Sequence, residues 1–112
     1  MALWFLRGLR RGVVTTGYPA VVDAWARTLP TPPAFDPRQL TTELVDELAD
    51  LCPSGALSRD PQNLVLDIGR CSACGLCNAR AGGAARPSAA FELTATSRGR
   101  LVVHVPIEGA AP

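Results

Sequence analysis

The chain has 112 residues, of which 47% are hydrophobic and 19% are charged, and its formal net charge is +1. A chain of this length forms one small domain with extensions, and the apolar core that it can bury is modest. The near-neutral charge provides no field that would attract a polyanion, so we expect no nucleic-acid partner.

The first predicted element is a short amphipathic helix. Apolar residues from Leu3 to Val14 recur at helical spacing, and three arginines lie on the other face. Such a helix lies in a membrane interface, or it packs on a partner subunit or on the protein's own core. It is too short and too charged to span a bilayer, and its charges follow the apolar stretch, unlike those of a secretion signal. The residues expected to contact a membrane or a partner are Trp4, Phe5, Leu6, Arg7, Leu9, Arg10 and Arg11.

A connector rich in proline follows a second short apolar stretch at residues 21–25. Proline removes a backbone donor and fixes φ, so the prolines at positions 30, 32, 33 and 37 predict an extended connector. We therefore expect residues 1–34 to form the helix and connector and residues 35–106 to form the compact domain. Residues 107–112 are expected to be a disordered tail.

The compact domain is predicted to be of the α+β class. Thr41 or Thr42 is expected to cap a helix. The apolar positions of this helix recur at Leu44, Leu48 and Leu51. The other expected elements are a hairpin of residues 56–57 and 65–68, a brief helix at residues 78–81, and strands at residues 91–94 and 101–105.

The four cysteines of the chain are spaced in a pattern that indicates a metal-binding site. Cys71, Cys74 and Cys77 form a C-x-x-C-x-x-C run, and Cys52 lies nineteen residues upstream of it, directly before a proline. In two-cluster bacterial ferredoxins, each C-x-x-C-x-x-C-x-x-x-C-P run gives three thiolates to one cluster, and its fourth cysteine ligates the other cluster. This chain matches one cluster's share of that pattern. We therefore expect the four cysteines to hold one [4Fe–4S] cluster.

The cysteines that are missing follow the same pattern. Counting back from the C-P cysteine by the motif spacing reaches Leu48, Val45 and Thr42, and counting forward from the last cysteine reaches Ala81. All ligands of one cluster are thus absent, and all ligands of the other are present. The chain resembles a ferredoxin-like pseudo-repeat that has lost one of its two clusters.

Other uses of four cysteines stay open. Structural zinc sites usually use two C-x-x-C pairs, or cysteine with histidine, rather than three cysteines at this spacing with one remote cysteine. A disulfide framework fits less well, because three of the cysteines crowd one short loop. Four unconnected core thiols are a further alternative. Soft thiolates on a tight loop suit an iron–sulfur cluster best, and reduced cysteines indicate a cytoplasmic compartment.

Two further residues bear on the predicted site. Gly75 lies inside the cysteine run, where the backbone has to pass close to a bound cluster. His104 is the one histidine of the chain. Alternation along its predicted strand places it opposite Val103 and Val105, towards solvent or a partner, so a role as a ligand or proton carrier is a minor alternative.

The order of these parts resembles a known family. An L-R-G-L helix at residues 6–9 runs into a T-G-Y-P entry at residues 16–19, and a proline-rich connector and the cysteine pattern follow. This order is similar to that of the iron–sulfur subunits of formate hydrogenlyase and energy-converting [NiFe] hydrogenases, and of the equivalent complex I subunit. The resemblance implies a small bacterial ferredoxin-like fold and a helix that rests peripherally on the cytoplasmic face of the cell membrane. It also implies docking to a hydrogenase small-subunit-like iron–sulfur protein, next to the one cluster whose ligands this chain retains.

The predicted function is that of an electron-transfer subunit that carries a single cluster and performs no bond chemistry itself. Its setting would be a membrane-associated hydrogenase-like or NADH-quinone-oxidoreductase-like complex. One alternative is a free soluble ferredoxin that shuttles electrons between enzymes, against which the N-terminal helix and the near-neutral charge argue. Another is a zinc-binding or structural adaptor subunit.

Overall fold

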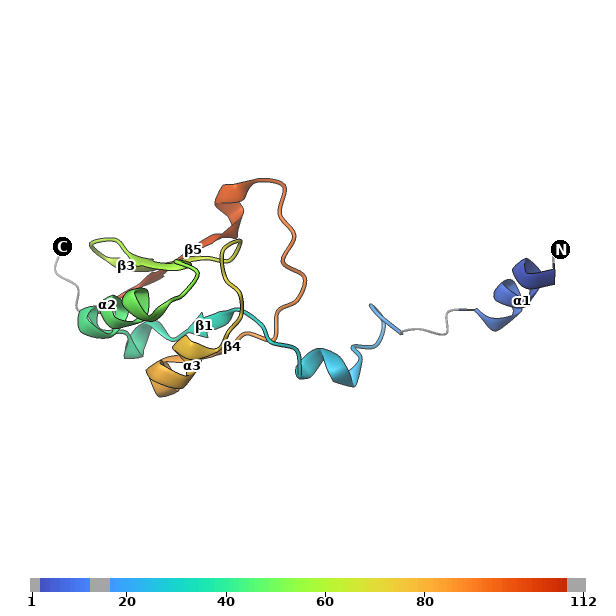
Figure 1. Cartoon of the computed structure of the whole chain (residues 1–112), viewed down its shortest axis with the longest axis horizontal. Coiled ribbons are helices and arrows are strands. Elements are labelled where there is room, and N and C mark those ends of the chain that lie inside the picture. The colour runs from blue at the N-terminus through green and yellow to red at the C-terminus, as the bar shows by residue number, and fades with distance from the viewer. Residues whose placement is uncertain (1–2, 13–16, 109–112) are drawn as a thin grey trace.

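The structure, a computed structural model, describes residues 3–12 and 17–108. Figure 1 shows a body of small sheets and helices and, drawn apart from it, a helix near the N-terminus. The parts of the predicted N-terminal helix at Val13 and Val14, and the predicted tail at residues 109–112, lie outside the described residues.

The strands and helices of the body follow one another in a simple order along the chain. Between residues 33 and 87 the chain runs strand, helix, strand, strand, helix, strand, which makes the domain a small α+β fold, as the sequence predicts. These elements are β1 (Pro33–Phe35), α2 (Thr42–Leu51), β2 (Leu57–Arg59), β3 (Asn63–Asp67), α3 (Leu76–Ala81) and β4 (Ala85–Pro87). The helix α1 (Leu3–Arg11) precedes them and the strand β5 (Val102–Pro106) follows. Short 3-10 helices cover Ala24–Arg27, Pro37–Gln39, Gly82–Ala84 and Arg98–Leu101.

The strands form two antiparallel sheets. β1 pairs with β4, and β3 lies between β2 and β5. The predicted hairpin and the predicted strand at residues 101–105 therefore form, within a residue or two of their expected bounds. Pro33, which the sequence assigns to the connector, instead begins β1 and lies opposite Pro87. The prolines are tolerated there because they stand at the end of a short two-stranded ladder.

The predicted strand at residues 91–94 is wrong. The structure gives residues 88–97 no strand, and the side chains of Phe91 and Glu92 instead contact Tyr18. The ring of Phe91 meets that of Tyr18 edge-on at a centroid distance of 5.5 Å, and the Tyr18 hydroxyl donates to the carboxylate of Glu92. The free edge of β3 is taken by β5, with Val65 opposite His104.

Helix α2 forms where the sequence predicts it. The Thr41 hydroxyl caps it by accepting a hydrogen bond from the Leu44 N–H at 3.3 Å. Val45 and Leu48 are fully buried, whereas Leu51 is 38% exposed. The buried face therefore runs through Val45 and Leu48. The expectation that Leu51 continues this face is wrong, because the helix ends at that residue.

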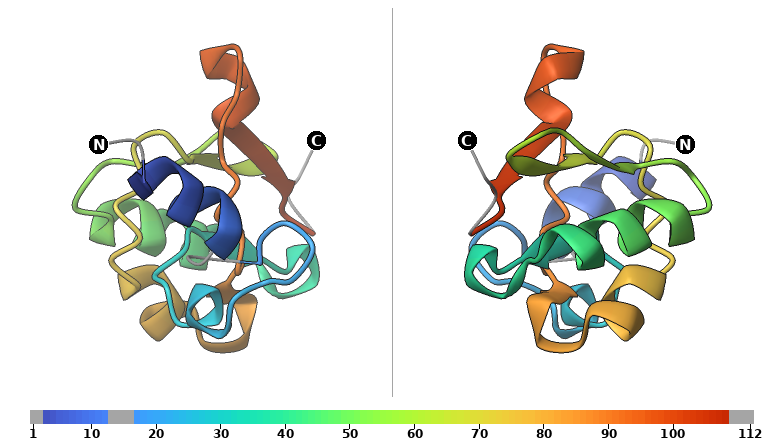
Figure 2. Two further views of the ribbon diagram at one scale, coloured as in Figure 1. Left: turned by 90° about the vertical axis from the view of Figure 1, so that its right-hand side faces the viewer. Right: turned by 90° about the vertical axis from the view of Figure 1, so that its left-hand side faces the viewer.

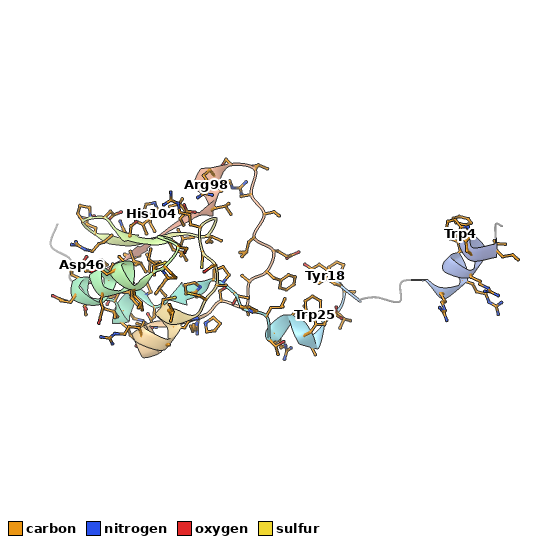
Figure 3. All side chains as sticks on the ribbon, in the orientation of Figure 1. Trp4, Tyr18, Trp25, Asp46, Arg98 and His104 are labelled. Carbon is orange, nitrogen blue, oxygen red and sulfur yellow. The ribbon has the colours of Figure 1, made fainter. Side chains whose placement is uncertain are left out.

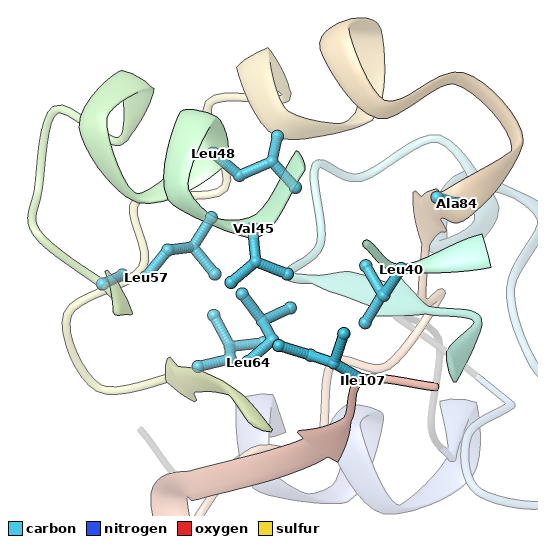
Figure 4. Packing of buried hydrophobic residues seen from close by; sticks show 9 residues of the cluster. Leu40, Val45, Leu48, Leu57, Leu64, Ala84 and Ile107 are labelled. Carbon is cyan, nitrogen blue, oxygen red and sulfur yellow. The ribbon is translucent and has the colours of Figure 1, made fainter. Parts of the chain in front are cut away.

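The core lies between α2 and the three-stranded sheet (Figure 4). Leu64 and Leu66 alternate on the face of β3 that points into it. Ile107, which the sequence assigns to the tail, is also buried, and its N–H donates to the Gln62 carbonyl at 2.9 Å. Figure 2 shows α2 between this sheet and α3, so α2 contacts both.

The N-terminal helix predicted from the sequence is present as α1, and none of its nine residues is buried. Trp4 is 75% exposed, and its ring lies edge-on to that of Phe5 at a centroid distance of 6.1 Å. No helix in the described parts of the chain is long and apolar enough to cross a membrane.

The substitution Leu48→Ala should lower the free energy of unfolding by about 2–5 kcal/mol, because it removes most of a fully buried side chain and leaves a cavity. Leu51→Ala is the matched control on the same helix and should cost less than about 1 kcal/mol, since this side chain is partly exposed. Chemical denaturation of both variants measures the difference. Equal losses would mean that α2 packs through a different face.

Candidate metal centre

All four cysteines line one pocket. Cys52 reaches it from the end of α2, Cys71 and Cys74 from the loop after β3, and Cys77 from the first turn of α3. All four are free thiols, so no disulfide links them. The structure therefore brings the remote cysteine to the C-x-x-C-x-x-C run, as the spacing predicts.

Backbone hydrogen bonds hold both sides of the pocket. The N–H of Cys52 donates to the Leu48 carbonyl at 3.1 Å, so this cysteine closes the last turn of α2. The N–H of Cys71 donates to the carbonyls of Asp67 and Ile68, each at 3.2 Å. These bonds form a tight turn directly after β3, and this turn starts the cysteine run beside the end of α2.

The run itself combines a loop with a helix. α3 begins at Leu76, two residues before the predicted start, so Cys77 lies on the helix. Gly75 caps α3 with φ of +79°, and Ala73 also has a positive φ of +53°. A Cβ on Gly75 would meet nothing within 4 Å. The left-handed conformation therefore favours glycine here, and no protein atom limits the space around it.

The Cys52 sulfur is surrounded by hydrogen-bond donors. Burial alone would raise the pKa of this thiol, but hydrogen bonds outweigh burial and lower it. The donors are the Ser54 hydroxyl, 3.6 Å from the sulfur, and the backbone N–H groups of Leu57, Ala56 and Ser54. The hydrogen bonds therefore stabilise the thiolate form of Cys52, which is the form that binds metals, relative to that of a free cysteine.

The Cys77 thiol behaves in the opposite way. Burial raises its pKa, and the nearby sulfurs of Cys71 and Cys74 raise it further by repelling a second negative charge. The N–H of Ala73 donates to the Cys71 sulfur at 3.4 Å. Among the described residues that line the pocket, none carries a cationic side chain. Burial and the neighbouring sulfurs therefore disfavour the thiolate form of Cys77 relative to that of an exposed cysteine.

The spacing of the thiols bears on the kind of metal. No three His, Cys, Asp or Glu side chains in the described residues are grouped closely enough to hold one metal ion. A tetrahedral zinc site with bonds of about 2.3 Å holds its sulfurs only about 3.8 Å apart. A [4Fe–4S] cluster takes its four thiolates on different irons and so accepts a wider set. Zinc and a [4Fe–4S] cluster thus make different demands on the separation of the four sulfurs.

The four positions that counting by the motif spacing reaches have structural places in the fold. Val45 and Leu48 are fully buried in α2, and Ala81 packs against the core from the end of α3. Thr42 is the first residue of α2. Leu48 also lines the cysteine pocket, so the helix forms one of its walls.

The remaining predicted residues lie outside this pocket. The seven predicted contact residues of α1 are exposed, and none of them lines the pocket. His104 is exposed on β5, as expected, and its Nδ1 lies 3.4 Å from the Asp60 carboxylate (Figure 3). Neither His104 nor Asp60 lines the pocket, so the structure gives no support to a ligand role for the histidine.

Sequence reasoning missed several residues of the pocket wall. Thr31 and Pro33 reach it from the expected connector, and Asn78 reaches it from α3. Asn78 directly follows a cysteine, and this is the one feature of the sequence from which its position in the pocket wall could be predicted. Thr31 and Pro33 give no such signal, because their approach depends on the pairing of β1 with β4.

No protein-family model matches this chain, and no curated protein matches it.

Gly75→Ala should lower the free energy of unfolding by about 1–2 kcal/mol, because the left-handed conformation is costly for any residue with a Cβ. Gly99→Ala is the matched control, since a Cβ there also meets nothing within 4 Å but no positive φ is required. It should be neutral or slightly stabilising. Thermal or chemical unfolding measures both, and equal effects would contradict the assigned role of the Gly75 backbone.

Proposed function

We propose that this protein is an electron-transfer subunit that carries one [4Fe–4S] cluster, ligated by Cys52, Cys71, Cys74 and Cys77. The observation that carries this proposal is that all four thiols line one pocket, although one of them comes from a different part of the chain. The donor set supplies four soft thiolates, which is the usual complement of such a cluster.

The element order supports a ferredoxin-like fold for the domain. Strand, helix, strand, strand, helix, strand is the order of that fold, and the two helices stand at equivalent places in its two halves. In the first half, Val45 and Leu48 occupy the positions that ligands would occupy in a two-cluster protein. This substitution supports a ferredoxin-like pseudo-repeat that has kept one cluster of two.

The pocket favours electron transfer over bond chemistry. Among the described residues that line it, there is no histidine, carboxylate, lysine or arginine that could act as a general acid or base. A bound [4Fe–4S] cluster accepts and donates single electrons at a potential set by burial and hydrogen bonds to its sulfurs. Leu48 and Leu66 exclude water from one side of the pocket, and the Ala73 N–H donates to a ligand sulfur. Cys74 is exposed and offers the edge nearest to a partner.

The helix α1 supports attachment to a membrane-associated complex. Its apolar residues are more than half exposed, and three arginines accompany them without an acidic residue. A helix of this kind binds at the interface of an anionic membrane or on an acidic partner surface. We place the protein peripherally on the cytoplasmic face of the cell membrane, in a hydrogenase-like or NADH-quinone-oxidoreductase-like complex. A hydrogenase small-subunit-like iron–sulfur protein is the expected electron partner.

Anaerobic reconstitution should yield about four iron and four acid-labile sulfide per chain, and one S = 1/2 signal on reduction. Cys52→Ser should lose iron as fully as Cys74→Ser, because both thiols line the same pocket. Ser72→Ala is the matched control, since this residue lines the pocket without a thiol. Iron and sulfide analysis with visible spectroscopy measures the outcome. Stoichiometric zinc without sulfide, or full iron content in Cys52→Ser, would contradict the proposal.

Deletion of residues 1–12 should leave the iron content unchanged, because no cysteine lies there, and should release the protein from membranes or from its complex. The deletion leaves the contact of Tyr18 with Phe91 in place. Reversing Arg7, Arg10 and Arg11 to glutamate should weaken attachment by about 1 kcal/mol per residue, with a dependence on salt that the deletion lacks.

Flotation on vesicles with anionic lipid measures this attachment, and vesicles of neutral lipid are the control. A truncated chain that loses its iron, together with a full-length chain found only in the soluble fraction, would make α1 a core element. That result would favour the free soluble ferredoxin over the membrane-associated subunit.

A further inference from the structure

Asn78 is a polar residue of the cysteine pocket that ligation leaves unexplained. It directly follows Cys77 on α3 and lines the pocket. Its Oδ1 has no accessible surface and no hydrogen-bond partner. The only other such side-chain atom in the described residues is Oδ1 of Asp67, whose second carboxylate oxygen accepts from Arg98.

An unpaired buried amide is costly, so proteins rarely keep one without a function or a missing partner. The two ends of the Asn78 amide have nearly the same shape, and a half-turn exchanges them. The exchange presents N–H donors in place of the unpaired oxygen. The pocket offers the acceptors, since thiolates and the sulfides of a cluster accept hydrogen bonds and donate none.

We infer that the side-chain amide of Asn78 donates a hydrogen bond to a sulfur of the bound cluster and thereby raises its reduction potential. This inference rests on the proposed function. The reduced cluster carries one more negative charge than the oxidised cluster, so a donor stabilises the reduced form more. The electron comes from the donor protein in the complex and passes on to the acceptor, and the amide loses no proton.

Asn78 differs from the other donors near the sulfurs. The Ala73 N–H and the N–H groups that surround Cys52 belong to the backbone, so a substitution other than to proline does not remove them, and the one side-chain donor given for Cys52 is the Ser54 hydroxyl. Asn78 is the one side-chain amide among the described residues that line the pocket. Substitution at this position therefore changes the hydrogen bonding to the cluster without changing its four ligands.

The test is a redox titration of the reconstituted full-length chain, followed by the S = 1/2 signal. Asn78→Leu removes the donor at similar size and should make reduction about tenfold less favourable, which is about 59 mV for one electron. Asn78→Asp keeps the shape but adds negative charge and should lower the potential at least as far. Ser58→Ala, exposed on β2 and outside the pocket lining, should keep the wild-type potential.

Each outcome separates this inference from the proposed function. Full iron content with a wild-type potential in both Asn78→Leu and Asn78→Asp would overturn the inference and leave the cluster assignment intact. A wild-type chain that binds no iron and sulfide would overturn the proposed function first. If Asn78→Leu loses the cluster, the test is Asn78→Gln, because glutamine keeps an N–H donor. If Asn78→Gln binds iron and has a near-wild-type potential, the inference is supported. If Asn78→Gln loses as much iron as Asn78→Leu, the inference is overturned.

Discussion

The packing of α2 against the sheet of β2 and β3 is the constraint on which both the core and the pocket depend. Leu48 is fully buried in the core and also lines the cysteine pocket. The helix that closes the core is therefore the same helix that carries Cys52 to the run after β3. A slip of one residue along α2 would rotate its side chains by about 100°. Such a slip would expose Val45 or Leu48 and turn Cys52 away from the other thiols.

The sequence predicts the elements that local physics decides. The hydroxyl cap at Thr41, the helical period of α2 and the alternation in β3 all act within a few residues. It does not predict β1, because Pro33 gains its strand conformation only from Pro87 and its neighbours far along the chain. The false strand at residues 91–94 has the same cause. Phe91 suits a strand, but the edge of β3 is taken by β5 and the ring instead contacts Tyr18.

The candidate site divides in the same way. The grouping of the four cysteines follows from spacing, because thiolate ligands leave a chemical pattern in the sequence. The wall of the pocket leaves no such pattern. Thr31 reaches it through the pairing of two distant strands, and Asn78 becomes notable only because its buried oxygen has no partner. The candidate ligands are thus predictable from residue type, whereas the groups that would tune a bound cluster depend on the tertiary fold.

The two halves of the domain stabilise their loops by different means. α2 has ten residues, begins at the Thr41 cap and is held by Val45 and Leu48 in the core. α3 has only six residues and follows a loop in which Ala73 and Gly75 are left-handed. Such a conformation is costly for alanine and persists only where the surroundings hold it. In the first half, α2 is held in place by apolar side chains of the core, which pack whether or not a metal is bound. In the second half the Ala73 N–H donates to the Cys71 sulfur, and Cys71 and Cys77 pack against the core. Under the proposed function, cluster binding therefore contributes folding free energy chiefly to that half.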